Sequence, residues 1–214
     1  MAKQSKQLFS DDFRAEFDRL IRWRRDVRRF RTDPVNEDLI EQCLATFNHA
    51  PSVGLSEPWR VVRVQSDTAR AAALSNFQAA NEQALAGYSG DKGQLYAGLK
   101  LSGMQNAPVQ LAIFCDETTQ KGSGLGAGTM PQMRRYSVVG AISQFWLVTR
   151  AHGLGVGWVS ILDPEQLTRD LDVPTGWALV SYLCIGWPQE DADTPELERA
   201  GWETRNTKLT PLLR

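Results

Sequence analysis

PVQLAIFC, residues 108–115, is an almost uninterrupted apolar run of strand length. A run of this kind predicts a central β-strand that is buried on both of its faces. Further strand candidates occur at 60–65, 156–161 and 178–185. Together these segments predict a mostly buried sheet of about four or five strands.

Helical patterns surround these strands. Phe13, Phe17, Leu20 and Ile21 recur at helical spacing and predict an amphipathic helix over about 11–23. Asn36 is suited to cap a second helix, whose apolar face comprises Leu39, Ile40, Cys43, Leu44 and Phe47. Other helices are predicted at 67–86, at 93–105, at 132–151 and from Pro164 onward.

The order of these elements indicates an α+β fold in which helices flank the sheet. The chain does not open with a strand and does not run as βαβ units, which argues against a Rossmann fold. The glycine motif at 153–157 follows a predicted helix and enters a predicted strand. That is the reverse of the context that a dinucleotide-binding loop requires.

The chain has 214 residues, enough for one substantial domain without disulfides or metal ions. We expect a single domain over 1–214, with residues 1–19 as an N-terminal extension that runs into the first helix. Residues 188–214 are polar and interrupted by prolines. This C-terminal arm contains too few apolar residues for a core element, so we expect it to wrap over another surface.

Composition narrows the function classes. The formal net charge of −1 argues against nucleic-acid binding driven by bulk charge. No apolar stretch approaches the roughly 20 residues that span a bilayer, and the polar N-terminus does not resemble a signal peptide. The three cysteines are scattered without a C-x-x-C pair, and the two histidines lack metal-ligand spacing. We therefore expect a cytoplasmic protein with buried thiols and no metal site.

An arginine cluster, RRDVRR at 24–29, follows the first predicted helix. Several guanidinium groups together favour a phosphorylated ligand. Asp26 within the cluster would repel a phosphate, so it needs another reason to be there, and proton transfer on the bound molecule is one. The alternative is a solvated charge run with an internal salt bridge.

Other polar and aromatic side chains are weaker candidates. Ser52 lies in a loop framed by proline and glycine, where a plain turn is an equally good interpretation. Trp59 and Trp158 could flank a flat aromatic ligand, although large aromatic residues are more often part of the core. Ser160, at the end of an apolar strand, could face a pocket, and Arg205 could complete a phosphate site from the arm.

The chain resembles the flavin-dependent nitroreductase superfamily from about residue 20 to its end. The matching motifs are R-R-x-V-R at 24–28, A-P-S at 50–52 with P-W at 58–59, and A-H-G-L-G-V-G-W at 151–158. The resemblance implies a homodimer with a central, mostly antiparallel sheet, with FMN at the subunit interface and the C-terminal arm around the partner subunit.

The resemblance also implies binding residues. Arg24, Arg25, Arg28 and Arg205 are expected at the FMN phosphate, and Ser52 beside the flavin ring. Five further flavin-binding residues are expected in the matched motifs: Val27, Pro58, Trp59, Gly157 and Trp158. Lys100 is expected to bind the flavin from a candidate lid at about 85–100, which also contains Tyr96.

Within the superfamily, the chain is most similar to the BluB branch, whose members form 5,6-dimethylbenzimidazole. The similar motifs are R-R-D-V-R, A-P-S-V-G-L-S-x-P-W, P-Q-M-x-x-Y-S at 131–137 and G-W-V-S-I at 157–161. Ordinary nitroreductases commonly have a small hydroxyl residue in place of Asp26. Glu57 departs from the pattern, because a neutral residue often precedes Pro-Trp.

This branch implies that reduced FMN and molecular oxygen are co-substrates. The flavin is fragmented to 5,6-dimethylbenzimidazole, the lower ligand of cobalamin, and erythrose 4-phosphate, and a separate flavin reductase supplies the reduced FMN. Asp26 is expected to be the acid/base group and Ser160 the second catalytic residue. The arginines should keep Asp26 ionised unless burial opposes them.

Two rival functions remain open from the sequence. One is an NAD(P)H-dependent, FMN-containing nitroreductase or flavin reductase, in which the flavin stays bound and is recycled. The other is a flavin-binding storage or sensor protein. Neither gives Asp26 a chemical role.

Overall fold

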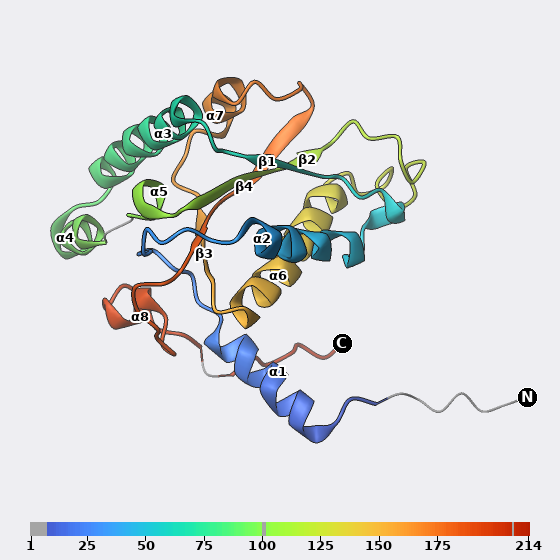
Figure 1. The fold of residues 1–214 in the computed structure, drawn as a ribbon, viewed down its shortest axis with the longest axis horizontal. Coiled ribbons are helices and arrows are strands. Elements are labelled where there is room, and N and C mark those ends of the chain that lie inside the picture. Colours follow the sequence, from blue (N-terminus) through green and yellow to red (C-terminus); the bar gives the residue numbers. More distant parts are fainter. Residues whose placement is uncertain (1–7, 100–101, 207) are drawn as a thin grey trace, which may run out of the picture.

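A four-stranded antiparallel sheet forms the centre of the part that the computed structural model describes, residues 8–99, 102–206 and 208–214 (Figure 1). The spatial order is β1-β2-β4-β3, and every neighbouring pair is antiparallel. The strands are β1 Trp59–Arg63, β2 Val109–Asp116, β3 Gly155–Val159 and β4 Trp177–Gly186. The predicted α+β class, the four strand positions and the interior place of residues 108–115 are confirmed.

Every residue of β2 is buried, because helices cover both faces of the sheet. Leu111 and Ile113 belong to the hydrophobic cluster that includes α2 and α6. Ala112 and Phe114 alternate with them and belong to the cluster that includes α3, α5 and α7. The helices are α1 Asp11–Trp23, α2 Glu37–Leu44, α3 Asp67–Ala86, α4 Gly90–Gly98, α5 Gly103–Asn106, α6 Met133–Ala151, α7 Pro164–Asp170 and α8 Glu196–Arg199, with 3₁₀ turns at Ala45–His49 and Val53–Leu55.

Side-chain caps fix where several helices begin. Asn36, the predicted cap of α2, accepts a hydrogen bond from Asp38 N at 2.7 Å. Ser10 and Ser66 cap α1 and α3 in the same way, and Asp163 caps α7 directly before Pro164. These contacts satisfy backbone donors that the first turn leaves free. In the described ranges, no helix has both the length and the apolar composition to cross a membrane.

The expectation of one helix over 93–105 is wrong. The chain instead forms α4, which ends at Gly98, and the short helix α5, which begins at Gly103. Leu99 has left the helical conformation, with φ −74° and ψ 101°. Glycines at 90, 93 and 98 weaken the helical propensity of this segment, so tertiary contacts decide where its helices end.

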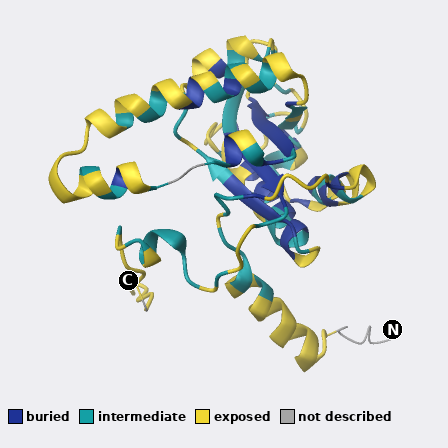
Figure 2. Ribbon diagram, turned by 60° about the vertical axis from the view of Figure 1, so that its left-hand side comes forward, coloured by how far each residue is buried: buried dark blue, intermediate teal, exposed yellow. Residues whose placement is uncertain are grey.

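The two ends of the chain differ in how they pack. No residue of α1 is buried (Figure 2), and only its C-terminal end contacts the body, where the Arg150 guanidinium lies 3.4 Å from the Trp23 ring centroid. The C-terminal arm returns to the arginine cluster of its own chain. Gln189 N donates to Arg29 O at 3.1 Å, and Arg25 Nε donates to Asp193 O at 2.9 Å.

The three cysteines are buried and free, as predicted. Cys43 and Cys115 lie in the cluster between the sheet and α6, and Cys184 lies in the cluster on the opposite face.

Candidate functional site

The arginine cluster lies along the free edge of β3. Val27 N donates to Val156 O at 3.0 Å, and Asp26 forms a parallel bridge with Val156. Gly157 permits this close approach, because a Cβ at that position would lie 2.2 Å from the Val27 carbonyl oxygen. Gly155 does the same for the Val27 side chain. The glycines at 153–157, which do not fit a dinucleotide motif, thus include two that let the RRDVRR segment dock on the sheet.

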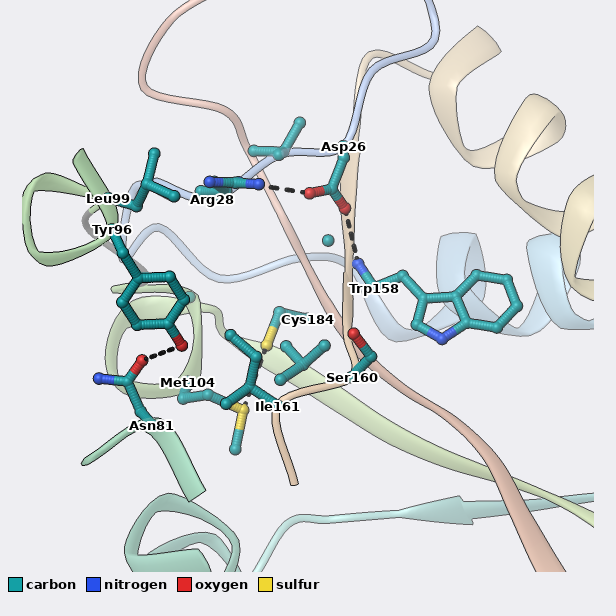
Figure 3. Close-up of a pocket in the computed structure, with 14 residues that line it drawn as sticks. Asp26, Arg28, Asn81, Tyr96, Leu99, Met104, Trp158, Ser160, Ile161 and Cys184 are labelled. Carbon is teal, nitrogen blue, oxygen red and sulfur yellow. Dashed lines mark hydrogen bonds and ion pairs between the residues drawn. The ribbon is translucent and has the colours of Figure 1, made fainter. Parts of the chain in front are cut away.

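Asp26 is held from two sides at this edge (Figure 3). Its Oδ1 accepts a hydrogen bond from Trp158 N at 2.9 Å, and its Oδ2 lies 3.5 Å from Arg28 Nε. Burial raises the pKa of the Asp26 carboxyl above its ordinary value, although the Trp158 N–H and then Arg28 oppose that shift. The side chain is crowded by protein yet 41% exposed, because it lies at the wall of a cavity. The effect of burial on the pKa of Asp26 is therefore larger than the opposing effect of the arginines.

An apolar pocket opens on one side of Asp26 and has a volume of about 120 Å³. Asp26 and Ser160, the two predicted catalytic residues, both line it (Figure 3). Ser160 directly follows β3, whose Trp158 holds the Asp26 carboxylate. The remaining lining residues are Val27, Arg28, Asn81, Tyr96, Leu99, Gly103, Met104, Gly157, Trp158, Val159, Ile161 and Cys184.

A cationic cavity opens on the other side of Asp26. Arg24, Arg25, Arg28 and Arg205 line it together, so the structure brings the late arginine to the cluster as the resemblance implies. Burial and then the nearby charge of Arg205 lower the pKa of Arg24, and the same two causes lower the pKa of Arg25. Mutual repulsion of this kind favours binding of an anion.

Arg28 lies at the boundary between the two cavities. Its Nη1 is buried and has no hydrogen-bond partner in the described part of the chain. Arg28 and Asp26 both line the apolar pocket and the cationic cavity, so these two residues stand where the cavities meet. An unpaired buried guanidinium nitrogen is costly unless a ligand satisfies it.

Three of the predicted flavin-binding residues lie elsewhere in the chain. Ser52, Pro58 and Trp59 do not line the Asp26 pocket. Ser52 Oγ instead accepts a hydrogen bond from Glu57 N at 3.0 Å. Trp59 packs edge-on against Phe47 in the core, with ring centroids 6.1 Å apart. Within one chain, therefore, Trp59 and Trp158 do not flank a common pocket.

Lys100 and Glu57 are two further residues that the sequence singled out. Lys100 lies outside the residues that the structure describes. Glu57, which departs from the family pattern, forms an ion pair with Lys121, so its charge is compensated. Across the described ranges, no group of histidine, cysteine, aspartate and glutamate side chains is arranged to hold a metal ion.

The sequence did not single out several residues of the pocket. Asn81 accepts a hydrogen bond from Tyr96 Oη at 2.9 Å, and this pair closes one end of the pocket (Figure 3). Asn81 could have been noticed as a polar residue in an alanine-rich helix. Cys184 and Met104 contact each other through sulfur at 3.8 Å, and burial raises the pKa of Cys184 to about 12, so its thiol stays neutral.

Comparison with known proteins gives the family of the chain. The model of the nitroreductase family matches residues 21–187. The chain belongs to the nitroreductase family. It is 54% identical over 198 residues to a 5,6-dimethylbenzimidazole synthase of Rhodospirillum rubrum, a match that covers 92% of this chain and 94% of the relative. The predicted resemblance to this branch of the nitroreductases is confirmed.

Solved structures share the fold of this chain. An iodotyrosine deiodinase bound to FMN and 3-iodo-L-tyrosine has a TM-score of 0.75 at 19% identity, covering 92% of this chain and 99% of the other. A BluB-like flavoprotein from Clostridium difficile has a TM-score of 0.64 at 18% identity, covering 84% and 93%.

Proposed function

We propose that this protein is a 5,6-dimethylbenzimidazole synthase, which fragments reduced FMN with molecular oxygen and releases erythrose 4-phosphate. One observation of the structure carries the proposal: the Asp26 carboxyl lies at the junction of an apolar pocket and a cavity lined by four arginines. Such a junction is where the ribityl chain would run between the flavin ring and its phosphate. The 54% identity to a synthase supports the same conclusion.

The residues present suit FMN. Arg24, Arg25, Arg28 and Arg205 would hold the phosphate, because their pooled positive charge and the unpaired Arg28 Nη1 match its oxygens. The apolar pocket would take part of the ring. Its volume of about 120 Å³ is below the roughly 300–1,000 Å³ of ordinary ligand sites, so α4 has to move or a second subunit has to complete the site.

The pocket residues then have separate roles. Reduced FMN supplies the electrons that react with oxygen when it is bound. Asp26, whose pKa is raised above its ordinary value by burial, moves a proton at the ribityl chain or the ring. Ser160 orients the flavin or relays that proton, and the apolar lining excludes water.

We propose further that the protein acts as a homodimer. The loop with Ser52, Pro58 and Trp59, which does not reach the pocket of its own chain, would then approach the flavin of the partner subunit. Exposed apolar side chains support the same assembly: Phe13, Phe17, Ile21, Leu209, Leu212 and Leu213. In this proposal, residues 208–214 embrace the partner, whereas the arm up to Arg205 serves its own chain.

The proposal also requires an outside source of reduced FMN. Because the flavin is consumed as a substrate, each turnover needs a new molecule, which a separate flavin reductase would supply. The buried free thiols fit a reducing compartment, and we propose that the protein is cytoplasmic.

The test is a product assay with stoichiometric reduced FMN under air and under anaerobic conditions. We expect loss of flavin and formation of 5,6-dimethylbenzimidazole only when oxygen is present. Recovery of intact oxidised FMN without benzimidazole would contradict the proposal and indicate a conventional flavin reductase, in which the flavin is recycled.

A further inference from the structure

An aromatic cluster joins the C-terminal arm to the helix that borders the pocket. Trp202, on the arm, has its ring centroid 5.5 Å from Tyr88 in an edge-on arrangement and 6.3 Å from Tyr96. Tyr88, just before α4, and Tyr96, within α4, stack with ring centroids 5.0 Å apart. These separations are typical of attractive aromatic pairs.

Lys92, within α4, holds the same tryptophan. Its Nζ lies 4.5 Å from the Trp202 ring centroid and donates to Trp202 O at 2.5 Å. A cation–π contact and a hydrogen bond thus add to the aromatic contacts. Trp202 is half-buried, whereas its neighbours Gly201 and Glu203 are exposed, so among these three residues Trp202 makes the packing contact with α4.

The Trp202 contact connects the apolar pocket, on the side of α4, with the cationic cavity, on the side of the C-terminal arm. On the helix side, Tyr96 is buried, bonds to Asn81 and lines the apolar pocket beside Asp26. On the arm side, Arg205 follows Trp202 by a few residues and lines the cationic cavity. The arm is also fixed to the cluster by the Arg29–Glu196 ion pair at 3.2 Å.

We propose that Trp202 is a positioning residue that couples binding of the phosphate group to closure of α4 over the Asp26 pocket. An anion between Arg205 and the arginines at 24–28 relieves their mutual repulsion and fixes the arm. The fixed arm presents Trp202 to Tyr88 and Tyr96, which holds Tyr96 in the pocket wall. The substrate class favoured by this device is a flavin that carries a terminal phosphate, rather than riboflavin.

The coupling matters because the pocket of one chain is smaller than an ordinary ligand site, and α4 forms part of its wall through Tyr96. A helix that closes only when phosphate is bound would exclude water from the correct substrate and leave others exposed. This inference rests on the proposed function for its meaning in catalysis, but the coupling itself can be measured without turnover.

The first experiment measures amide hydrogen exchange of residues 88–98 in the full-length protein, with and without saturating oxidised FMN, and with inorganic phosphate as the minimal probe. In the wild type, we expect either ligand to slow exchange there by about tenfold or more, the factor that aromatic and cation–π contacts of this kind supply. In Trp202→Ala, the slowing is expected to be lost. Trp202→Phe, which keeps an aromatic ring, is expected to restore most of it.

Trp177→Ala is the matched control. Trp177 also contacts an aromatic residue and a cation, Phe114 and Arg60, but does not line the pocket. It should leave the ligand effect on residues 88–98 intact. The proposal is overturned if phosphate and FMN do not protect these residues in the wild type, if Trp202→Ala retains the protection, or if Trp202→Phe behaves as alanine does.

The second experiment follows the fate of reduced FMN in air. We expect Trp202→Ala to return most of the flavin as intact FMN while the wild type forms 5,6-dimethylbenzimidazole, and to lose the preference for binding FMN over riboflavin. Equal product yield and equal discrimination in Trp202→Ala would refute the coupling. If the wild type itself forms no benzimidazole, the proposed function fails, while the exchange experiment still decides the role of Trp202.

Discussion

Burial and neighbouring groups shift the pKa of Asp26 in opposite directions. The Asp26 backbone is bridged to β3, and its carboxylate accepts a hydrogen bond from Trp158 N and lies near Arg28. Burial nevertheless raises the pKa of Asp26. A carboxyl with a raised pKa is a better proton donor and acceptor for acid/base chemistry than an ordinary surface aspartate. At the residue scale, the candidate site is therefore tuned by its surroundings rather than by residue type alone.

Asp26→Asn tests the chemical role directly. The amide keeps the shape and can still accept the Trp158 hydrogen bond, but it cannot transfer a proton. We expect 5,6-dimethylbenzimidazole formation to fall by at least about 100-fold, while FMN affinity is unchanged or rises because a negative charge near the phosphate is removed. Product assay and flavin titration check both results.

Asp33→Asn is the control for this variant, since Asp33 is an exposed carboxylate paired with Arg31 outside the site. It should leave both quantities unchanged. Unaltered product formation in Asp26→Asn would show that the carboxylate is not the acid/base group.

The raised pKa of Asp26 also predicts a pH-dependent stability. Because burial favours the protonated carboxyl in the folded state, its stabilising contribution is full below the ordinary pKa of 3.8 and is lost as the pH rises through the higher folded value. Asparagine does not titrate. Asp26→Asn should therefore become more stable than the wild type as the pH rises from 3.8 through the raised pKa of Asp26 in the folded protein.

Thermal unfolding at several pH values measures this difference. The gain in Tm should be small, on the order of 1–2 °C, because the side chain is partly exposed and screened by solvent. A constant or reversed difference between the two proteins across this range would mean that the pKa of Asp26 is not raised.

At the scale of elements, the docking of residues 24–29 on β3 positions the whole site. The parallel bridge at Val156 and the absence of a side chain at Gly157 let Val27 approach the sheet, which places Asp26 beside Trp158 and Arg28 beside both cavities. The strand supplies a rigid support, so the segment needs few contacts of its own.

Gly157→Ala should disturb this docking. The new Cβ would meet the Val27 carbonyl oxygen at 2.2 Å, and neither backbone can yield cheaply. We expect the free energy of unfolding to fall by about 1–3 kcal/mol and FMN binding to weaken. Chemical denaturation and flavin titration measure the two effects.

Gly140→Ala provides the comparison, since a Cβ there meets no atom within 4 Å and the position lies inside α6. That variant should be neutral or more stable by up to about 1 kcal/mol. If both variants behaved alike, close approach at Gly157 would not be the reason for the glycine.

On the scale of the whole molecule, α1 leaves an aromatic stripe exposed. Phe9, Phe13 and Phe17 stack on one another along one face, and Phe13, Phe17 and Ile21 remain 44–47% exposed. Apolar faces of this kind mark interaction surfaces. In the proposed homodimer, the partner subunit covers this stripe.

Phe17→Asp tests that assembly. Loss of one buried aromatic side chain corresponds to about 1.5–3 kcal/mol, so we expect the dissociation constant of the dimer to rise by roughly 10- to 100-fold. Ala15→Asp adds the same charge on the opposite face of α1 and should have little effect. Analytical ultracentrifugation over a range of concentrations distinguishes them, and identical behaviour of the two variants would exclude the stripe from the interface.

Local patterns were enough to predict most elements and to single out residues that the structure brings together. Asn36 caps α2 through backbone groups only two or three residues away, and the apolar run at 108–115 is recognised by its composition alone. Both features can therefore be read from a short stretch of sequence. The arginine cluster predicted an anion site for the same reason, since its charges are adjacent in the chain. The single helix expected over 93–105 failed because a glycine-rich segment has weak local preferences that tertiary contacts override.

The tertiary structure alone decided how distant residues meet. Trp202 reaches Tyr96 only because the arm folds back toward α4. The same path brings Arg205 to the arginine cluster, a placement that the sequence predicted through the family resemblance and not through any local pattern. The raised pKa of Asp26 likewise depends on burial that no local pattern encodes. Residue types and local propensities are written in the sequence, whereas desolvation and long-range contacts arise only when the chain is packed.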